Sequence, residues 1–132
     1  MFPPETKILI VDDMKTMRKI VMKALKNMGY SNFIEAENGN IAWAKLNEEK
    51  DIGLIISDWN MPECTGLNFL KMVRSSSDFK NTPFVLVTAE SEMSQVQEAV
   101  QAGVDNYIVK PFSAQSLQEK LMAVYKKRLA AA

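Results

Sequence analysis

The sequence contains no histidine, only one cysteine and no net charge. Without histidine, the chain has no Ser-His-Asp or Cys-His catalytic group of the usual kind, no histidine-ligated zinc site and no phosphohistidine of its own. Cys64 cannot form an internal disulfide, which suits a reducing cytoplasm. The balanced charge gives no overall attraction to nucleic acid or to a membrane surface. A metal ion in this chain would have to be a hard cation with oxygen ligands.

Long hydrophobic runs are also absent. The longest runs, such as 8–11 and 84–87, are far too short to cross a bilayer, and the first residues do not have the pattern of an export signal. We therefore expect a cytoplasmic protein. The chain has 132 residues, 47% of them hydrophobic, and is long enough for one domain (1–132) with its own core. Residues 129–132 are expected to be either a flexible tail or a remnant of cloning.

Short apolar segments alternate with amphipathic ones along the chain. The expected strands are 7–11, 33–37, 53–57, 84–88 and 106–110. The expected helices are about 17–28, 41–47, 66–74, 91–102 and a last one that begins after Ser113 as its N-cap. This alternation predicts an α/β doubly wound parallel sheet of five strands with five helices. Crossovers between parallel strands are right-handed, so the C-terminal ends of all strands are expected at one edge of the sheet.

The first expected helix has an apolar face and a strongly basic face. The apolar face is expected to contain Met17, Ile20, Val21, Ala24, Leu25 and Met28, and Gly29 is expected to end the helix. The basic face contains Lys15, Arg18, Lys19, Lys23 and Lys26. Such a face is usually solvated, and the alternative is a docking surface for an acidic partner.

Polar side chains lie at the C-terminal ends of four of the five expected strands. Asp12 and Asp13 follow the first strand and Asp58 the third, and Thr88 and Lys110 are the last residues of the fourth and fifth. Each has an ordinary explanation on its own, such as a helix cap or a strand-end lysine, but their convergence on one edge indicates a shared site. Three neighbouring carboxylates repel one another unless one is protonated or a cation binds, and oxygen ligands favour Mg2+. A cation, a lysine and a hydroxyl around one acid suit phosphoryl transfer to an aspartate.

These residues lie in motifs that resemble the response-regulator receiver family over nearly the whole chain. The motifs are Asp12-Asp13, Ser57-Asp58-Trp59-Asn60-Met61-Pro62, Thr88-Ala89-Glu90 and Tyr107-Ile108-Val109-Lys110-Pro111-Phe112. The match is closest to the single-domain chemotaxis regulators of that family. The resemblance implies a flavodoxin-like sheet with the strand order 2-1-3-4-5.

The resemblance also implies a phosphoacceptor and a metal site. Asp58 is expected to accept a phosphoryl group from a histidine kinase of the chemotaxis type or from a phosphotransfer protein. Mg2+ is expected to be held by Asp58, Asp12, Asp13 and the backbone carbonyl of Asn60, with Asp12 acting through water. No other cofactor is implied, and the chain is expected to be a regulator that catalyses only its own phosphoryl transfer and dephosphorylation.

The remaining roles implied by the resemblance concern the response to phosphorylation. Lys110 and Thr88 are expected to contact the phosphoryl group, and Thr88 and Tyr107 to act as the switch. Asn60 and Glu90 occupy the positions that tune the lifetime of the phosphate. From the residues alone, Tyr107 would instead be a half-buried strand aromatic whose hydroxyl needs a partner.

The implied output is a change in the face formed by the fourth helix, the fifth strand and the fifth helix. This face is expected to bind an output protein, the flagellar switch in chemotaxis, and a phosphatase is a further expected partner. The alternatives are a phosphorelay intermediate or adaptor outside chemotaxis, and a receiver domain cut from a longer regulator. A monomer that binds neither nucleic acid nor membrane is expected.

Three other functions are alternatives to that of a receiver domain. A haloacid-dehalogenase-type phosphatase would need a second acid two residues after Asp58, where this chain has Asn60. A flavin- or nucleotide-binding protein would need a glycine-rich phosphate loop, and neither GxGxxG nor GxxxxGK[ST] occurs. The third is an interaction module that retains the fold without phosphorylation.

Overall fold

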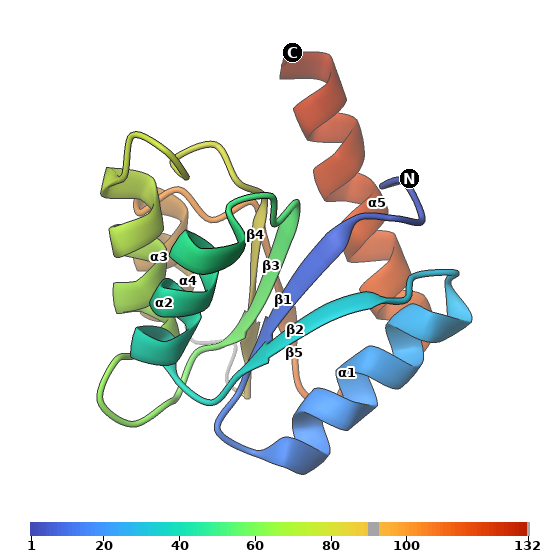
Figure 1. Ribbon diagram of the computed structural model, residues 1–132, viewed down its shortest axis with the longest axis horizontal. Helices are drawn as coiled ribbons and strands as arrows, with labels where there is room; N and C mark the ends of the chain where they lie inside the picture. The colour runs from blue at the N-terminus through green and yellow to red at the C-terminus, as the bar shows by residue number, and fades with distance from the viewer. Residues whose placement is uncertain (90–92, 132) are drawn as a thin grey trace.

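A five-stranded parallel sheet lies between two layers of helices in the computed structural model, which describes residues 1–89 and 93–131 (Figure 1). The strands are β1 (Lys7–Val11), β2 (Asn32–Ala36), β3 (Leu54–Asp58), β4 (Phe84–Thr88) and β5 (Asn106–Val109). The helices are α1 (Lys15–Asn27), α2 (Gly39–Glu49), α3 (Gly66–Ser75), α4 (Met93–Gln101) and α5 (Ala114–Ala131). The strand order is β2-β1-β3-β4-β5, which confirms the predicted doubly wound α/β fold.

The helices cover both faces of the sheet. Figure 1 shows α1 and α5 on one face and α2, α3 and α4 on the other. Every residue of β3 and β4 is buried, which explains why these segments read as nearly continuous apolar runs in the sequence. The loops that follow β1 and β3 lie together at the lower edge in Figure 1, and both chain ends lie at the opposite edge. Within the described residues, no helix combines the length and the apolar character needed to span a membrane.

Two helix ends follow the local signals in the sequence. The amide of Ser116 donates to Oγ of Ser113 and the amide of Ser113 donates to Oγ of Ser116, both at 3.0 Å, so Ser113 is confirmed as the N-cap of α5. At the end of α1, Gly29 has φ of 100° and the amide of Tyr30 donates to the carbonyl oxygen of Leu25. This left-handed glycine ends the helix as expected.

Two predictions for α1 are wrong. Ile20, expected in the core, is 50% exposed, and Arg18, expected on the solvated face, is only 8% exposed. The buried side chains of the helix are those of Arg18, Val21, Ala24 and Leu25. The helix is therefore rotated relative to the predicted apolar face, because the guanidinium group of Arg18 finds acceptors beneath the helix that residue periodicity does not reveal.

Strands β1 and β4 have the predicted bounds, and the other described boundaries differ from the predicted ones by at most two residues. Strand β3 ends on Asp58 itself and β5 ends at Val109, one residue before Lys110. The predicted start of the fourth helix at residue 91 lies outside the described part of the chain. Helix α5 includes residues 129–131, the segment for which a flexible tail or a cloning remnant was expected.

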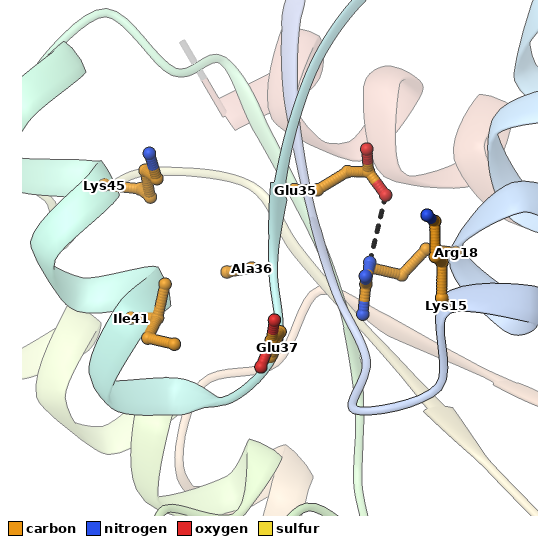
Figure 2. A pocket seen from close by; sticks show the side chains of 7 residues that line it. All are labelled: Lys15, Arg18, Glu35, Ala36, Glu37, Ile41 and Lys45. Carbon is orange, nitrogen blue, oxygen red and sulfur yellow. Dashed lines mark hydrogen bonds and ion pairs between the residues drawn. The ribbon is translucent and has the colours of Figure 1, made fainter.

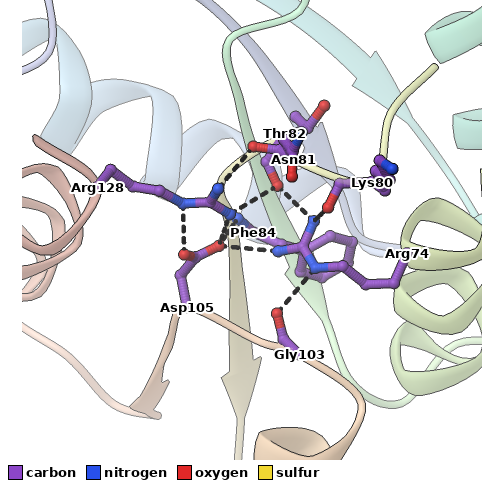
Figure 3. Close-up of polar contacts among 8 residues, drawn as sticks. All are labelled: Arg74, Lys80, Asn81, Thr82, Phe84, Gly103, Asp105 and Arg128. Atoms are coloured by element: carbon purple, nitrogen blue, oxygen red, sulfur yellow. Dashed lines mark hydrogen bonds and ion pairs between the residues drawn. The ribbon is translucent and has the colours of Figure 1, made fainter. Parts of the chain in front are cut away.

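At the edge of the sheet formed by the N-terminal ends of β4 and β5, a partly buried ion-pair network surrounds the carboxylate of Asp105 (Figure 3). The carboxylate of Asp105 accepts hydrogen bonds from Arg74 at 2.9 Å and from Arg128 at 2.7 and 2.8 Å. It also accepts one from the amide of Phe84 at 2.8 Å. Because Arg74 lies on α3 and Arg128 on α5, this network joins helices from both faces of the sheet. No role was predicted for these residues from the sequence.

Candidate functional site

Three carboxylates meet at the C-terminal edge of the sheet. Val11 at the end of β1 pairs with Ser57 of β3, so the residues that follow them, Asp12 and Asp58, lie side by side. Asp13 is the next residue along the loop. One carboxylate oxygen from each of the three acids lies within 4.8 Å of the other two. We call Asp12, Asp13 and Asp58 the acid cluster; Asp12 and Asp58 are buried and Asp13 is exposed.

Lys110 brings a positive charge to the acid cluster. Its Nζ lies 2.7 Å from Oδ1 of Asp58 and 3.7 Å from Oδ2 of Asp12. The side chain crosses the end of β4 to reach them, and the amide of Lys110 is fixed by a 2.7 Å hydrogen bond to the carbonyl oxygen of Thr88. The predicted convergence of strand-end side chains is thus present for the acids and for the lysine.

The predicted switch residues lie next to one another on β4 and β5. Thr88 is buried at the end of β4 and pairs with Val109, and Tyr107 pairs with Leu86. In parallel strands this register puts Thr88 and Tyr107 on diagonally neighbouring positions. Tyr107 is half-buried and packs against the core beneath α2, α3 and α4, and Nζ of Lys120 lies 5.1 Å from its ring centre.

The two positions expected to tune the phosphate lifetime are placed unequally. Asn60 is exposed in the loop between β3 and α3, two residues after Asp58. Glu90 lies outside the described residues. Asn60 is therefore near the acid cluster in the sequence, and the roles expected of Asn60 and Glu90 stay predictions.

Burial disfavours the charged forms of the two buried carboxylates, those of Asp12 and Asp58. Desolvation raises the pKa of Asp58; Lys110 opposes this rise, and the neighbouring charge of Asp13 adds to it. Desolvation also raises the pKa of Asp12, and the charge of Asp58 adds to that rise. Three acids with one lysine thus leave uncompensated negative charge at a place where water is partly excluded. The donor set, carboxylate oxygens alone, fits a hard metal cation, so the acid cluster can bind a metal ion.

Two residues that support the acid cluster were not identified from the sequence. A side chain on Gly66 would overlap with the main-chain carbonyl oxygen of Asp58, so only glycine lets α3 start so close to β3. Arg18 donates from Nη1 to the carbonyl oxygen of Asp12 at 2.6 Å. The spacing of Arg18 three and seven residues before Val21 and Leu25, which are both buried, was the signal that could have revealed it.

Residues 8–122 match the family described as the response regulator receiver domain. The chain is 49% identical over 118 residues to the chemotaxis protein CheY1 of Helicobacter pylori, covering 89% of this chain and 95% of that protein. It is 43% identical over 121 residues to the chemotaxis protein CheY of Pseudomonas aeruginosa, covering 92% and 97%. Among solved structures, the chemotaxis response regulator CheY4 of Vibrio cholerae has a TM-score of 0.83 at 37% identity, covering 91% of this chain and 98% of that one.

These similarities confirm the resemblance that the strand-end motifs indicate, and they extend over the segments that carry the acid cluster and Lys110. The chain therefore belongs to the response regulator receiver domain family, as a CheY-like regulator of two-component signalling.

Proposed function

We propose that Asp58 is the phosphoacceptor of a regulator that is activated by phosphorylation. The observation that supports this best is the surroundings of its carboxylate, with Nζ of Lys110 at 2.7 Å and two further acids within 4.8 Å. Asp58 is the last residue of a fully buried strand, so its position is fixed by the sheet. An acid held in this way beside a cation-binding group suits in-line attack on a phosphoryl donor.

The transfer starts from a phosphohistidine on a histidine kinase or a phosphotransfer protein. A carboxylate oxygen of Asp58 attacks the phosphorus, the P–N bond breaks, and the departing imidazole nitrogen takes a proton. The product is an acyl phosphate on Asp58. Lys110, already paired with Oδ1 of Asp58, is placed to neutralise the charge on the phosphoryl oxygens.

The acid cluster would hold Mg2+ through Asp12, Asp13 and Asp58, together with the backbone carbonyl of Asn60. When bound, the cation supplies positive charge that offsets the three carboxylates and the incoming phosphoryl group. Asp12 would act through a water molecule, as the family resemblance implies, and its Oδ1 also accepts a 2.9 Å hydrogen bond from the amide of Met14.

The signal would pass from Asp58 to the output face through Thr88 and Tyr107. The new phosphoryl oxygens attract the hydroxyl of Thr88, and its movement leaves room for the ring of Tyr107 to turn inward. The surface formed by α4, β5 and α5 then favours binding of an output protein. Such coupling between two sites typically amounts to about 1–3 kcal/mol.

The partners follow from the relatives, which are named as chemotaxis proteins. We propose a histidine kinase of the chemotaxis type as the phosphodonor, the flagellar switch as the output partner, and a phosphatase that ends the signal. Asn60 and Glu90 would tune the lifetime of the acyl phosphate.

Incubation with acetyl phosphate and Mg2+ tests the proposal. Intact-mass spectrometry should show one added phosphoryl group on the wild-type protein, and this group should be lost at alkaline pH, as expected of an acyl phosphate. Asp58→Asn should fold normally and remain unmodified, whereas the matched control Asp78→Asn, at an exposed acid in the loop after α3, should be modified like the wild type. Base-labile modification of Asp58→Asn would show that the phosphoacceptor is another residue.

A further inference from the structure

Arg18 is a buried cation beside the acid cluster, and the proposed phosphoryl transfer does not use it. Its side chain extends from α1 toward Glu35 on β2 (Figure 2). Nε donates to Oε1 of Glu35 at 3.0 Å, and Nη1 donates to the carbonyl oxygen of Asp12 at 2.6 Å. The same guanidinium group lines a pocket of about 300 Å³ together with Lys15, Glu35, Ala36, Glu37, Ile41 and Lys45.

Burial of this guanidinium group is not explained by packing alone. Removing an arginine from water is costly, and its ion-pair partner Glu35 is 43% exposed and therefore only partly offsets that cost. An aliphatic side chain would fill the space between α1 and the sheet without this penalty. What the guanidinium group adds is a short, charge-assisted hydrogen bond to one main-chain oxygen, that of Asp12.

That oxygen belongs to the peptide that joins Asp12 to Asp13. The rest of Asp12 is held independently, because its amide donates to the carbonyl oxygen of Ala36 at 3.1 Å and its Oδ1 accepts from the amide of Met14 at 2.9 Å. The Asp13 carboxylate has no such restraint, since no hydrogen bond or ion pair to it occurs within the described part of the chain. The orientation of the peptide between the two acids therefore determines where the Asp13 carboxylate lies.

We propose that Arg18 is a positioning residue of the cation site. Its guanidinium group fixes the peptide between Asp12 and Asp13, so that both carboxylates face Asp58 within the 4.8 Å of the acid cluster. Glu35 orients the guanidinium group from the outside. The proposal rests on the function proposed above only for the identity of the cation, and it assigns to Arg18 an effect on cation affinity rather than on the chemistry at Asp58.

Titration of the unphosphorylated protein with Mg2+ alone, followed by isothermal titration calorimetry, tests the proposal. Arg18→Met keeps the aliphatic stem but removes the donors, and should weaken Mg2+ binding about tenfold, as is usual for residues that orient metal ligands. Arg18→Lys keeps the positive charge and a donor nitrogen without the planar fork of the guanidinium group, and should recover part of the affinity. The control Lys19→Met removes an exposed neighbouring charge from the same helix and should leave the dissociation constant within about twofold.

A second control separates positioning from general loss of stability. Val21→Ala removes a buried side chain of α1 that packs in the core and contributes no hydrogen bond to the acid cluster. It should lower the urea midpoint at least as much as Arg18→Met but leave the Mg2+ dissociation constant unchanged. An unchanged dissociation constant in Arg18→Met, or an equal loss in Val21→Ala, would overturn the proposal. Because these titrations need no phosphodonor, a failure of wild-type labelling by acetyl phosphate would count against the phosphoacceptor and not against Arg18.

Discussion

Replacing Asp13 with asparagine is expected to make the metal-free protein more stable. Asp13 is exposed, and its carboxylate lies within 4.8 Å of those of Asp12 and Asp58. Lys110 forms ion pairs with Asp58 and Asp12 but not with Asp13. The substitution therefore removes two repulsions and no attractive pair that the described residues contain.

The size of the gain follows from these distances. Two unit charges 4.8 Å apart repel by about 3.5 kcal/mol at an effective dielectric constant of about 20. Asp13 takes part in two such repulsions, but solvent and salt screen an exposed carboxylate strongly. We therefore expect the free energy of unfolding to rise by about 1–2 kcal/mol at neutral pH and low salt.

The pH dependence of this gain has a definite sign. The pKa values of Asp12 and Asp58 are raised in the folded state, mainly by burial, and the charge of Asp13 contributes to both. A folded state with raised carboxyl pKa values binds protons more tightly than the unfolded state, so wild-type stability decreases as the pH rises from about 4 through the raised values. Asp13→Asn should show a shallower decrease, and its advantage should be small at low pH and complete at neutral pH.

Urea denaturation followed by circular dichroism, in EDTA and over a series of pH values, measures this difference. With saturating Mg2+ the wild type should become more stable than Asp13→Asn. The wild type has one metal ligand more, so Mg2+ binding adds more to its free energy of unfolding. An unchanged or lower stability of Asp13→Asn in EDTA would refute the electrostatic account. If Asp13→Asn were more stable than the wild type by the same amount at every pH, the gain would not come from weaker repulsion of the carboxylates of Asp12 and Asp58.

Three further predictions concern other parts of the molecule. Asp105→Ala leaves two arginines without a carboxylate that is only 7% exposed and should cost about 2–3 kcal/mol of unfolding free energy. Lys71→Met, at an ion pair whose side chains are 51% and 54% exposed, should change the urea midpoint far less, and similar effects would contradict a structural role for the network. Gly66→Ala forces α3 away from the carbonyl oxygen of Asp58 and should lower both stability and the rate of labelling by acetyl phosphate; an unchanged rate would show that α3 does not set the position of this acid. Lys110→Ala should still acquire the acyl phosphate, but the NMR shifts of β5 should no longer change on phosphorylation, and wild-type shift changes would argue against its role in the switch.

Much of the fold and of the acid cluster was predictable because both depend on local signals. Buried parallel strands read as short apolar runs, and because the strands run parallel, their C-terminal ends all lie at one edge. Asp58 and Lys110, 52 residues apart in the sequence, were therefore expected at the same edge, and their separation of 2.7 Å depends in addition on the strand order. The order of the strands did not follow from the residues and came from the family resemblance.

The residues that were missed have in common that their partners lie outside their own helix or strand. Periodicity treats arginine as polar and so placed Arg18 on the solvated face, but its burial depends on acceptors at Asp12 and Glu35. In the ion-pair network, Asp105 likewise binds arginine side chains that are 31 and 23 residues away in the sequence. Hydrophobic patterns contain no information on which main-chain or carboxylate oxygens a buried guanidinium group will meet.

The two edges of the sheet differ in how completely their charges are balanced. At one edge a single carboxylate, Asp105, is shared by two arginines, whose remaining donors reach main-chain carbonyl oxygens. At the other edge three carboxylates face one lysine, which leaves an excess of two negative charges. A divalent cation would neutralise that excess, and an added phosphoryl group would make the site negative again. At the first edge the arginines outnumber the carboxylate, but their remaining donors are taken up by main-chain oxygens, so this edge holds helices from both faces in place. The excess of negative charge at the second edge favours a cation there, and it fits the proposed response of that edge to phosphorylation.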